Sequence, residues 1–308
     1  MANHANEGAG AITQRARLTV PRAYKMYVGG AFIRSESGRY YQVSGMTTGS
    51  ADTEVVNIPL GSRKDARDAV LAAKGALHGW RARTPFNRGQ ILYRLAEMLE
   101  SRRDELVTSL VRAGASAADA GVEVDLSVDR ALWYAGLADK ISALVASHNP
   151  VAGPHFGFTL PEPVGLAAIV APESPALLGL VSTILPAIVT GSTAVVVAGE
   201  RDPRTAIVFC ECLATSDLPG GVVNVLTGRA SELAPQLARH REIQALDAWT
   251  SDTALRTLVE REGAGSVKRV KTHGDAAVAA LRDADAGQGL GFVERFLEMK
   301  TVWHPVGV

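Results

Sequence analysis

Residues 162–191 read EPVGLAAIVAPESPALLGLVSTILPAIVTG, and this stretch decides the fold class. The residues from Gly165 to Ala171 are apolar throughout, which is typical of a short strand buried on both faces of a sheet. The residues after Pro175 stay apolar over a length that suits a buried helix. Nucleotide-binding α/β proteins hold ligands where such a strand meets such a helix. Here the junction, residues 171–175, reads APESP, so the carboxylate of Glu173 stands at the turn, without a glycine or a lysine.

Outward from this stretch, strands and helices alternate along residues 162–274. Five short segments predict strands: GLAAIVA, TAVVVAG, VVNVLTG, ALDAWT and VKRVKTH. Helices are expected between them, at residues 175–188, 204–216, 231–240 and 252–262. The predicted fold class is α/β, with a Rossmann-like parallel five-stranded sheet, helices on both faces and an N-terminal helical segment.

The N-terminal third of the chain is predicted to be mostly helical. A short hairpin is expected to turn at Gly29-Gly30. Ser62 and Asp65 form a capping-box pattern at the start of a helix. A longer helix is expected over residues 87–114 and a third over 115–147, because apolar side chains recur there at helical spacing.

Two extended segments lie outside this pattern. Residues 148–161 have extended character, and residues 155–160, which Pro154 and Pro161 bound, alternate in polarity. Because proline donates no backbone hydrogen bond, this segment should be an edge strand or a protruding hairpin rather than a central strand. Near the C-terminus, apolar side chains alternate with Glu298 and Lys300, which fits a two-faced strand that needs a sheet to join.

The composition argues against several classes of protein. The chain has 32 basic and 32 acidic residues, whereas proteins that bind nucleic acid or anionic membranes usually carry a cationic excess. No uninterrupted apolar run is long enough to span a membrane, and the N-terminus lacks the apolar core of a signal peptide. We therefore expect a cytoplasmic protein. Cys210 and Cys212 are expected to be small buried side chains in a helix, because their spacing cannot clamp a metal and no histidine is nearby in the sequence.

The sequence resembles the aldehyde dehydrogenase superfamily over almost its whole length. Segments that carry the resemblance include KMYVGGAF, EPVGLAAIVAP, LPGGVVNVLTG and FLEMKTVW, in the family's order and spacing. The resemblance implies that GPHFGFTLPEP is an oligomerisation hairpin and that the last strand completes its sheet. It also implies an oligomer interface that includes Phe156, Phe158, Leu160, Leu297, Met299 and Trp303.

The departures from the family pattern fall at functional positions. In the family, an asparagine amide after the first strand stabilises the oxyanion. Glu173 takes its place here, and a carboxylate accepts hydrogen bonds but cannot donate them. In the family's ribose-binding motif, Val197 replaces the lysine and Glu200 is retained. Of the glycines that follow the third strand in the family, Gly228 remains.

The turn that faces the pyrophosphate in the family contains Ser251 here, and Asp252 follows it. A carboxylate at this position would cap the helix itself and leave fewer N–H groups for a phosphate. Val197, Glu200, Gly228 and Ser251 are therefore interpreted as a vestigial cofactor site. We expect no bound cofactor, or NAD with weak affinity, and no metal.

The resemblance also implies a catalytic domain with a cysteine nucleophile and a glutamate base, which in the family follows the fifth strand. Here residues 275–291 lead almost directly to the closing strand, so no catalytic residue is expected, and Glu173 is only a degenerate oxyanion position. The arrangement is similar to the second, nucleophile-less domain of two-domain aldehyde dehydrogenases. The expected parts are a mobile tail (1–24), an N-terminal helical part (25–147), the hairpin (148–161), the Rossmann-like part (162–274), a linker (275–291) and the tail strand (292–308).

Three functions stay open from the sequence. The first is a non-catalytic subunit or scaffold that forms a homo-oligomer, at least a dimer, or pairs with a complete aldehyde dehydrogenase chain. The second is a regulatory module that binds an NAD(P)-type nucleotide. The third is an enzyme with residual or altered chemistry, either an NAD-dependent aldehyde oxidoreductase that acts only with a partner chain or a site in which a buried Glu173 serves as general base.

Overall fold

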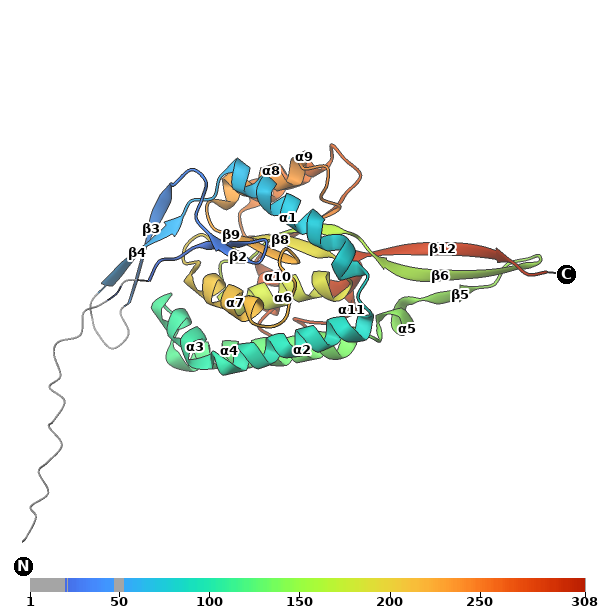
Figure 1. Ribbon diagram of the computed structural model, residues 1–308, viewed down its shortest axis with the longest axis horizontal. Helices are drawn as coiled ribbons and strands as arrows, with labels where there is room; N and C mark the ends of the chain where they lie inside the picture. Colours follow the sequence, from blue (N-terminus) through green and yellow to red (C-terminus); the bar gives the residue numbers. More distant parts are fainter. Residues whose placement is uncertain (1–19, 21, 47–52, 308) are drawn as a thin grey trace, which may run out of the picture.

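The computed structural model describes residues 20, 22–46 and 53–307, so most of the tail expected at residues 1–24 lies outside the described residues. The molecule has a layered body and an arm that extends from one end of it (Figure 1). The body contains a seven-stranded sheet and a two-stranded sheet, and the arm is a three-stranded sheet.

The seven-stranded sheet has the strand order β11-β10-β7-β8-β9-β1-β2. Its strands are β1 Met26–Val28, β2 Ala31–Ile33, β7 Leu166–Val170, β8 Thr193–Val197, β9 Val223–Leu226, β10 Ala245–Trp249 and β11 Arg269–His273. β7 to β11 are the five predicted strands, and they pair in parallel. The chain runs from β7 to β9 on one side and to β10 and β11 on the other, which is the order of a doubly wound sheet.

The expected number of five strands was wrong, because the hairpin β1-β2 joins the sheet. Tyr27 of β1 lies opposite Val225 of β9, and the two strands are antiparallel. A sheet that ended at β9 would leave a row of backbone N–H and C=O groups unpaired. The hairpin turns at Gly29 and Gly30, both at positive φ, as the sequence predicts.

Helices cover both faces of this sheet (Figure 1). One face carries α1 Arg63–Arg81, α8 Ala230–Arg239 and α9 Thr253–Gly263. The other face carries α6 Ala176–Val189 and α7 Arg204–Ala214, with an outer layer of α2 Pro85–Ser101, α3 Arg103–Arg112 and α4 Ala117–Leu137 packed over them. Every side chain of α6 after Ala176 is consequently buried. The remaining elements of the body are β3 Tyr40–Met46, β4 Thr53–Pro59, α5 Ile141–Val145, α10 Asp275–Ala280, α11 Leu290–Val293 and the 3₁₀ turn η1 Glu294–Phe296.

The capping box at Ser62 and Asp65 is present at the start of α1. The helix expected over residues 87–114 is instead divided at Arg102, which leaves the helical conformation. This break lets α3 turn onto α7, where Ser109 and Thr205 share a hydrogen bond of 3.0 Å. The helix expected over 115–147 is divided into α4 and α5 and ends in a strand.

The arm consists of β5 Ser147–Asn149, β6 His155–Pro163 and β12 Leu297–Pro305, in the order β12-β6-β5. Of the two alternatives expected for residues 148–161, an edge strand or a protruding hairpin, the structure shows the hairpin, formed by β5 and β6; β6 has neighbours on both sides only between Gly157 and Thr159. Pro161 lies beyond β5 and pairs only with β12, so β6 is an edge there and the missing N–H is tolerated.

The six expected interface residues are divided between the two faces of the arm. Phe156, Phe158 and Leu160 project to one face, whereas Leu297, Met299 and Trp303 project to the other, because directly paired residues share a face and neighbours alternate. Four of the six are exposed and Phe158 is half-buried, but Leu297 packs into the core of the body. Leu297 therefore offers no surface to a partner.

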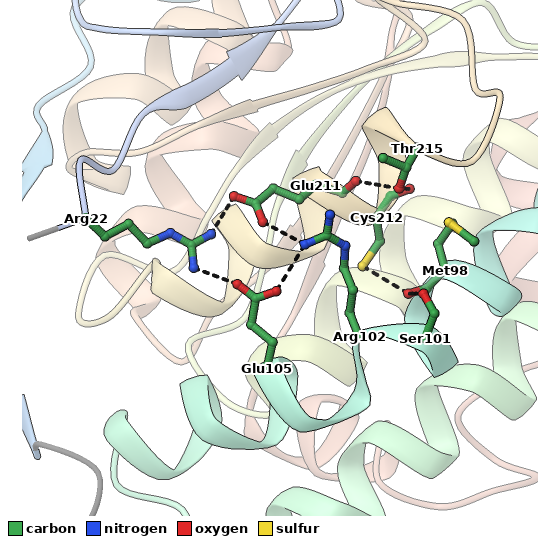
Figure 2. A network of polar contacts seen from close by, with 8 residues as sticks. All are labelled: Arg22, Met98, Ser101, Arg102, Glu105, Glu211, Cys212 and Thr215. Atoms are coloured by element: carbon green, nitrogen blue, oxygen red, sulfur yellow. Dashed lines mark hydrogen bonds and ion pairs between the residues drawn. The ribbon is translucent and has the colours of Figure 1, made fainter. Parts of the chain in front are cut away.

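A ring of four alternating charges joins the N-terminal segment to the helical layer (Figure 2). Arg22 pairs with Glu105 of α3 at 2.7 Å and with Glu211 of α7. Arg102 pairs with the same two carboxylates, each at 3.0 Å. The ring fixes Arg22 beside Tyr24, whose side chain is buried.

Arg102→Ala is expected to lower the free energy of unfolding by about 1 kcal/mol, because it leaves two carboxylates facing one cation. The loss should shrink at 1 M salt, since these charges are partly solvated. Urea unfolding at low and high salt measures both. Arg94→Ala, which removes a single exposed pair with Glu97 on α2, is the control; an equal loss in both variants would contradict a cooperative ring.

Candidate functional site

The candidate site is the edge of the sheet at which the parallel strands end. β7, β8, β9 and β10 all finish there, and α6, α7, α8 and α9 begin there. In doubly wound sheets ligands bind outside this edge, at the point where the strand order reverses. Helix N-termini present free N–H groups that attract anions. The partners of those N–H groups therefore decide what the edge can bind.

Glu173 follows β7 and binds the backbone of the loop after β8. Its Oε1 accepts a hydrogen bond from the N–H of Glu200 at 2.8 Å, and its Oε2 accepts one from the N–H of Arg201 at 3.2 Å. A Cβ at Gly199 would lie 2.9 Å from Oε2, so glycine permits this approach. The Glu173 side chain is 38% exposed, which does not match the buried general base of the third hypothesis. The carboxylate acts instead as an acceptor that ties two loops together.

Glu200 continues this connection to the next helix. Its Oε2 accepts a hydrogen bond from the N–H of Ala230, the first residue of α8, at 3.0 Å. Gly228 precedes α8 at φ +135°, and a Cβ there would lie 2.9 Å from the backbone nitrogen of Gly61. The structure thus brings Glu173, Glu200 and Gly228 together at one end of the edge.

Val197 and Ser251 do not join this cluster. Val197 is the last residue of β8 and is fully buried between Val170 and Leu226. Ser251 is exposed after β10, on the other side of β7. Asp252 caps α9 as expected, since its Oδ1 accepts from the N–H of Leu255 at 3.0 Å.

Sequence reasoning missed the carboxylate that caps α6. Oε1 of Glu123, on α4, accepts from the N–H groups of Leu177 and Leu178 at 2.7 and 3.2 Å. Burial raises the pKa of the Glu123 carboxyl, and these N–H groups act in the opposite direction. No local pattern marks Glu123, because the contact joins residues more than fifty positions apart. At α7, Asp202 accepts from the N–H of Arg204 at 3.1 Å.

A small cavity of about 220 Å³ adjoins the cluster, and its lining includes Tyr41, Glu200, Arg201, Gly228 and Arg229. The Tyr41 hydroxyl is buried and has no hydrogen-bond partner among the described residues. Burial, together with the nearby carboxylates of Glu200 and Glu173, raises the pKa of the Tyr41 phenol. The lining therefore combines a neutral phenol, a carboxylate and the two guanidinium groups of Arg201 and Arg229.

The two thiols lie far from this edge, inside α7. Cys210 is completely enclosed, and burial raises its pKa well above the ordinary value. Burial also raises the pKa of Cys212 to about 12, and its Sγ lies 3.7 Å from the carbonyl oxygen of Met98 (Figure 2). Both thiols stay protonated at neutral pH, so neither is an activated nucleophile.

The other end of the edge is closed by residues 275–296. Asp247, the middle residue of β10, is buried and accepts hydrogen bonds from Trp249 Nε1 at 2.8 Å, His273 Nε2 at 2.7 Å and Arg295 Nη1 at 3.0 Å. The rings of Trp249 and His273 stack with their centroids 3.7 Å apart. Arg130 of α4 holds the same segment by donating to the carbonyl oxygens of Leu281 and Asp283.

No group of three or more His, Cys, Asp or Glu side chains within residues 22–46 and 53–307 is arranged to hold a metal ion. In the same residues, no helix combines the length and the apolar character that crossing a membrane requires.

Comparison with known proteins gives consistent matches. Residues 33–290 match the model of the aldehyde dehydrogenase family. The chain is 28% identical over 275 residues to a cytosolic 10-formyltetrahydrofolate dehydrogenase of Xenopus tropicalis, covering 87% of this chain and 30% of that protein. It is 28% identical over 274 residues to an aldehyde dehydrogenase of Alternaria alternata, covering 87% of this chain and 54% of that one.

Among solved structures, the NAD-dependent aldehyde dehydrogenase from Sinorhizobium meliloti superposes with a TM-score of 0.74 and 28% identity, over 81% of this chain and 49% of that one. An aldehyde dehydrogenase from Brucella melitensis gives a TM-score of 0.75 at 23% identity, over 81% of this chain and 51% of that one. The chain thus spans about half the length of these dehydrogenases and less of the formyltetrahydrofolate enzyme.

Glu173→Ala is expected to lower the free energy of unfolding by about 1 kcal/mol, because two backbone N–H groups lose their acceptor. Glu173→Gln keeps one acceptor oxygen and should recover part of the loss. Chemical denaturation measures both, with Glu232→Ala on the exposed surface of α8 as the control. Wild-type stability of the Glu173→Ala variant would show that the carboxylate does not hold the loop.

Proposed function

The chain belongs to the aldehyde dehydrogenase family. We propose that, within this family, it acts as a non-catalytic, dehydrogenase-like subunit or scaffold. It assembles through its arm with a second copy of itself or with a complete aldehyde dehydrogenase chain. The proposed compartment is the cytoplasm, where the two free thiols stay reduced.

The observation that carries this proposal is the apolar exposure of the arm on both of its faces. Phe156 and Leu160 are exposed by 47% and 45% on one face, and Met299 and Trp303 by 47% and 61% on the other. A three-stranded sheet with no second layer buries little apolar surface by itself. Exposed apolar patches of this kind mark sites of protein association.

The state of the sheet edge supports a non-catalytic role. The N–H groups through which such an edge binds a phosphate already have carboxylate acceptors, at α6, α8 and α9 and in the loop after β8. A dinucleotide would have to displace these acceptors and lie among their negative charges. Catalysis by a thiol is also disfavoured, since Cys210 and Cys212 are buried and protonated.

A nucleotide-binding module is the second candidate, favoured by one observation. The cavity beside Glu200 pairs a hydroxyl donor with a carboxylate, which suits a hydroxyl group of a ligand. One similar structure is named as NAD-dependent and another as an NAD+ complex. A residual NAD-dependent oxidoreductase that acts only with a partner chain would need the same site.

Calorimetric titration of the full chain with NAD+, with light scattering on the same sample, separates these candidates. The scaffold proposal predicts an assembled particle and no saturable heat up to about millimolar NAD+, because the donors are occupied. Saturable binding in the micromolar range would contradict it and support the nucleotide-binding module.

Trp303→Glu is expected to shift the assembly toward monomers, because it places a charge on an apolar contact surface. Light scattering over a range of protein concentrations measures the shift. Val267→Glu, at a fully exposed position before β11, is the matched control. An unchanged particle mass in the Trp303 variant would contradict the role of the arm.

A further inference from the structure

A groove on the outer helical layer is a cavity that no step above has used. It lies between α2 and α4, has a volume of about 620 Å³ and is mostly apolar. Its lining includes Phe86, Gln90, Tyr93, Leu132, Ala135 and Gly136. We call it the α2–α4 groove.

Two glycines, Gly89 and Gly136, determine the shape of this groove. At Gly89 the helices approach so closely that a Cβ would lie 2.8 Å from the carbonyl oxygen of Ala135. At Gly136, one residue further along α4, a Cβ would meet no atom within 4 Å. Phe86 and Tyr93 stand beside this hollow with more than half of their surface exposed. The result is a recess with aromatic walls, which suits an apolar or aromatic side chain.

The arm carries side chains of that kind on its distal part. Phe156 and Trp303 lie near its tip, on opposite faces. Residues 147–160 and 301–307 contain no Asp, Glu, Lys or Arg, and three histidines are their only ionisable side chains. An exposed strand surface without charge lacks the protection that edge strands usually have. Such a surface fits an apolar recess that bears only Asp139 and Lys140 as charged residues.

The geometry favours a second copy of this chain as the source of that tip. The groove lies at the end of α4 that leads through α5 into β5, so it adjoins the base of the arm (Figure 1). β6 has nine residues, which corresponds to a reach of about 30 Å. Two arms laid antiparallel about a two-fold axis bring each tip to the base of the other, as a self-complementary interface requires.

We propose that the α2–α4 groove of one copy receives the tip of the arm of a second copy, with the side chain of Trp303 entering the hollow at Gly136. This inference rests on the proposed oligomerisation and adds the surface against which the arm packs. In this arrangement the α2–α4 groove and the tip of the arm are both removed from solvent, so one interface covers both apolar surfaces.

Gly136→Leu tests the groove, because a Cβ at this position meets no atom within 4 Å, the added side chain occupies the hollow, and leucine favours the helix. Gly79→Leu on α1 is the matched control, since a Cβ there also meets nothing within 4 Å and α1 lies on the opposite face of the sheet. Sedimentation velocity of the full chain should show that Gly136→Leu raises the dissociation constant of the dimer about tenfold, whereas Gly79→Leu leaves it unchanged. Circular dichroism confirms that both variants are folded.

Disulfide trapping gives a second readout. A chain with Trp303→Cys, mixed with a chain with Leu132→Cys and oxidised, should give a linked dimer; mixed with Leu71→Cys, an exposed residue of α1, it should not. No more linkage with Leu132→Cys than with Leu71→Cys, together with an unchanged Gly136→Leu dimer, would overturn the inference. In that case dissociation by Trp303→Glu would leave the proposed assembly through the arm standing. A chain that is monomeric at every concentration would overturn both.

Discussion

Parallel strands that all end at one edge force every following helix to begin there, and the free N–H groups of those helices must find acceptors. This chain supplies the acceptors itself, as carboxylates. They are Glu123 for α6, Asp202 for α7, Glu200 for α8, Asp252 for α9 and Glu173 for the loop after β8. Each of these carboxylates interacts favourably with the positive end of a helix dipole or with a pair of loop N–H groups. At each of these places one or two backbone N–H groups of the edge thus have a carboxylate acceptor within the chain.

The segment between β11 and β12 closes the same edge by a different means. Its contact with the sheet depends on Asp247, a buried carboxylate whose three donors come from β10, β11 and η1. A buried ion pair contributes little net stability once desolvation is included, but it tolerates few alternative arrangements. Asp247 therefore fixes where Arg295 lies, and Arg130 fixes the start of the segment from the other side. The apolar side chains of Val293 and Phe296 then complete the core.

Much of this fold could be predicted from the sequence, because apolar periodicity records burial directly. The strands β7 to β11 and the helices between them follow from this periodicity. The caps at Ser62 and Asp252 could also be predicted, because their partners lie within three residues in the sequence. Features set by distant contacts could not be predicted in this way. The break at Arg102 allows α3 to pack on α7. The strand β6 has two neighbours only over the three residues that pair with β5. At the candidate site, Glu173 was recognised by its position, but its bonds to the β8 loop and the cap by Glu123 join distant parts of the chain.

The pairing of β6 with β12 has a consequence for the order of folding. Thr159 and Thr301, which share a hydrogen bond of 2.9 Å across these strands, are 142 residues apart in the sequence. Contacts of such separation carry a large loop-closure entropy and form late, after the intervening chain has become compact. Here the intervening chain is the central sheet with its helices. The arm thus becomes complete only when the body has folded, so a chain with a misfolded body presents β6 without its partner strand β12. In the proposed assembly through the arm, such a chain would lack the contact surface, and association would therefore select for correctly folded chains.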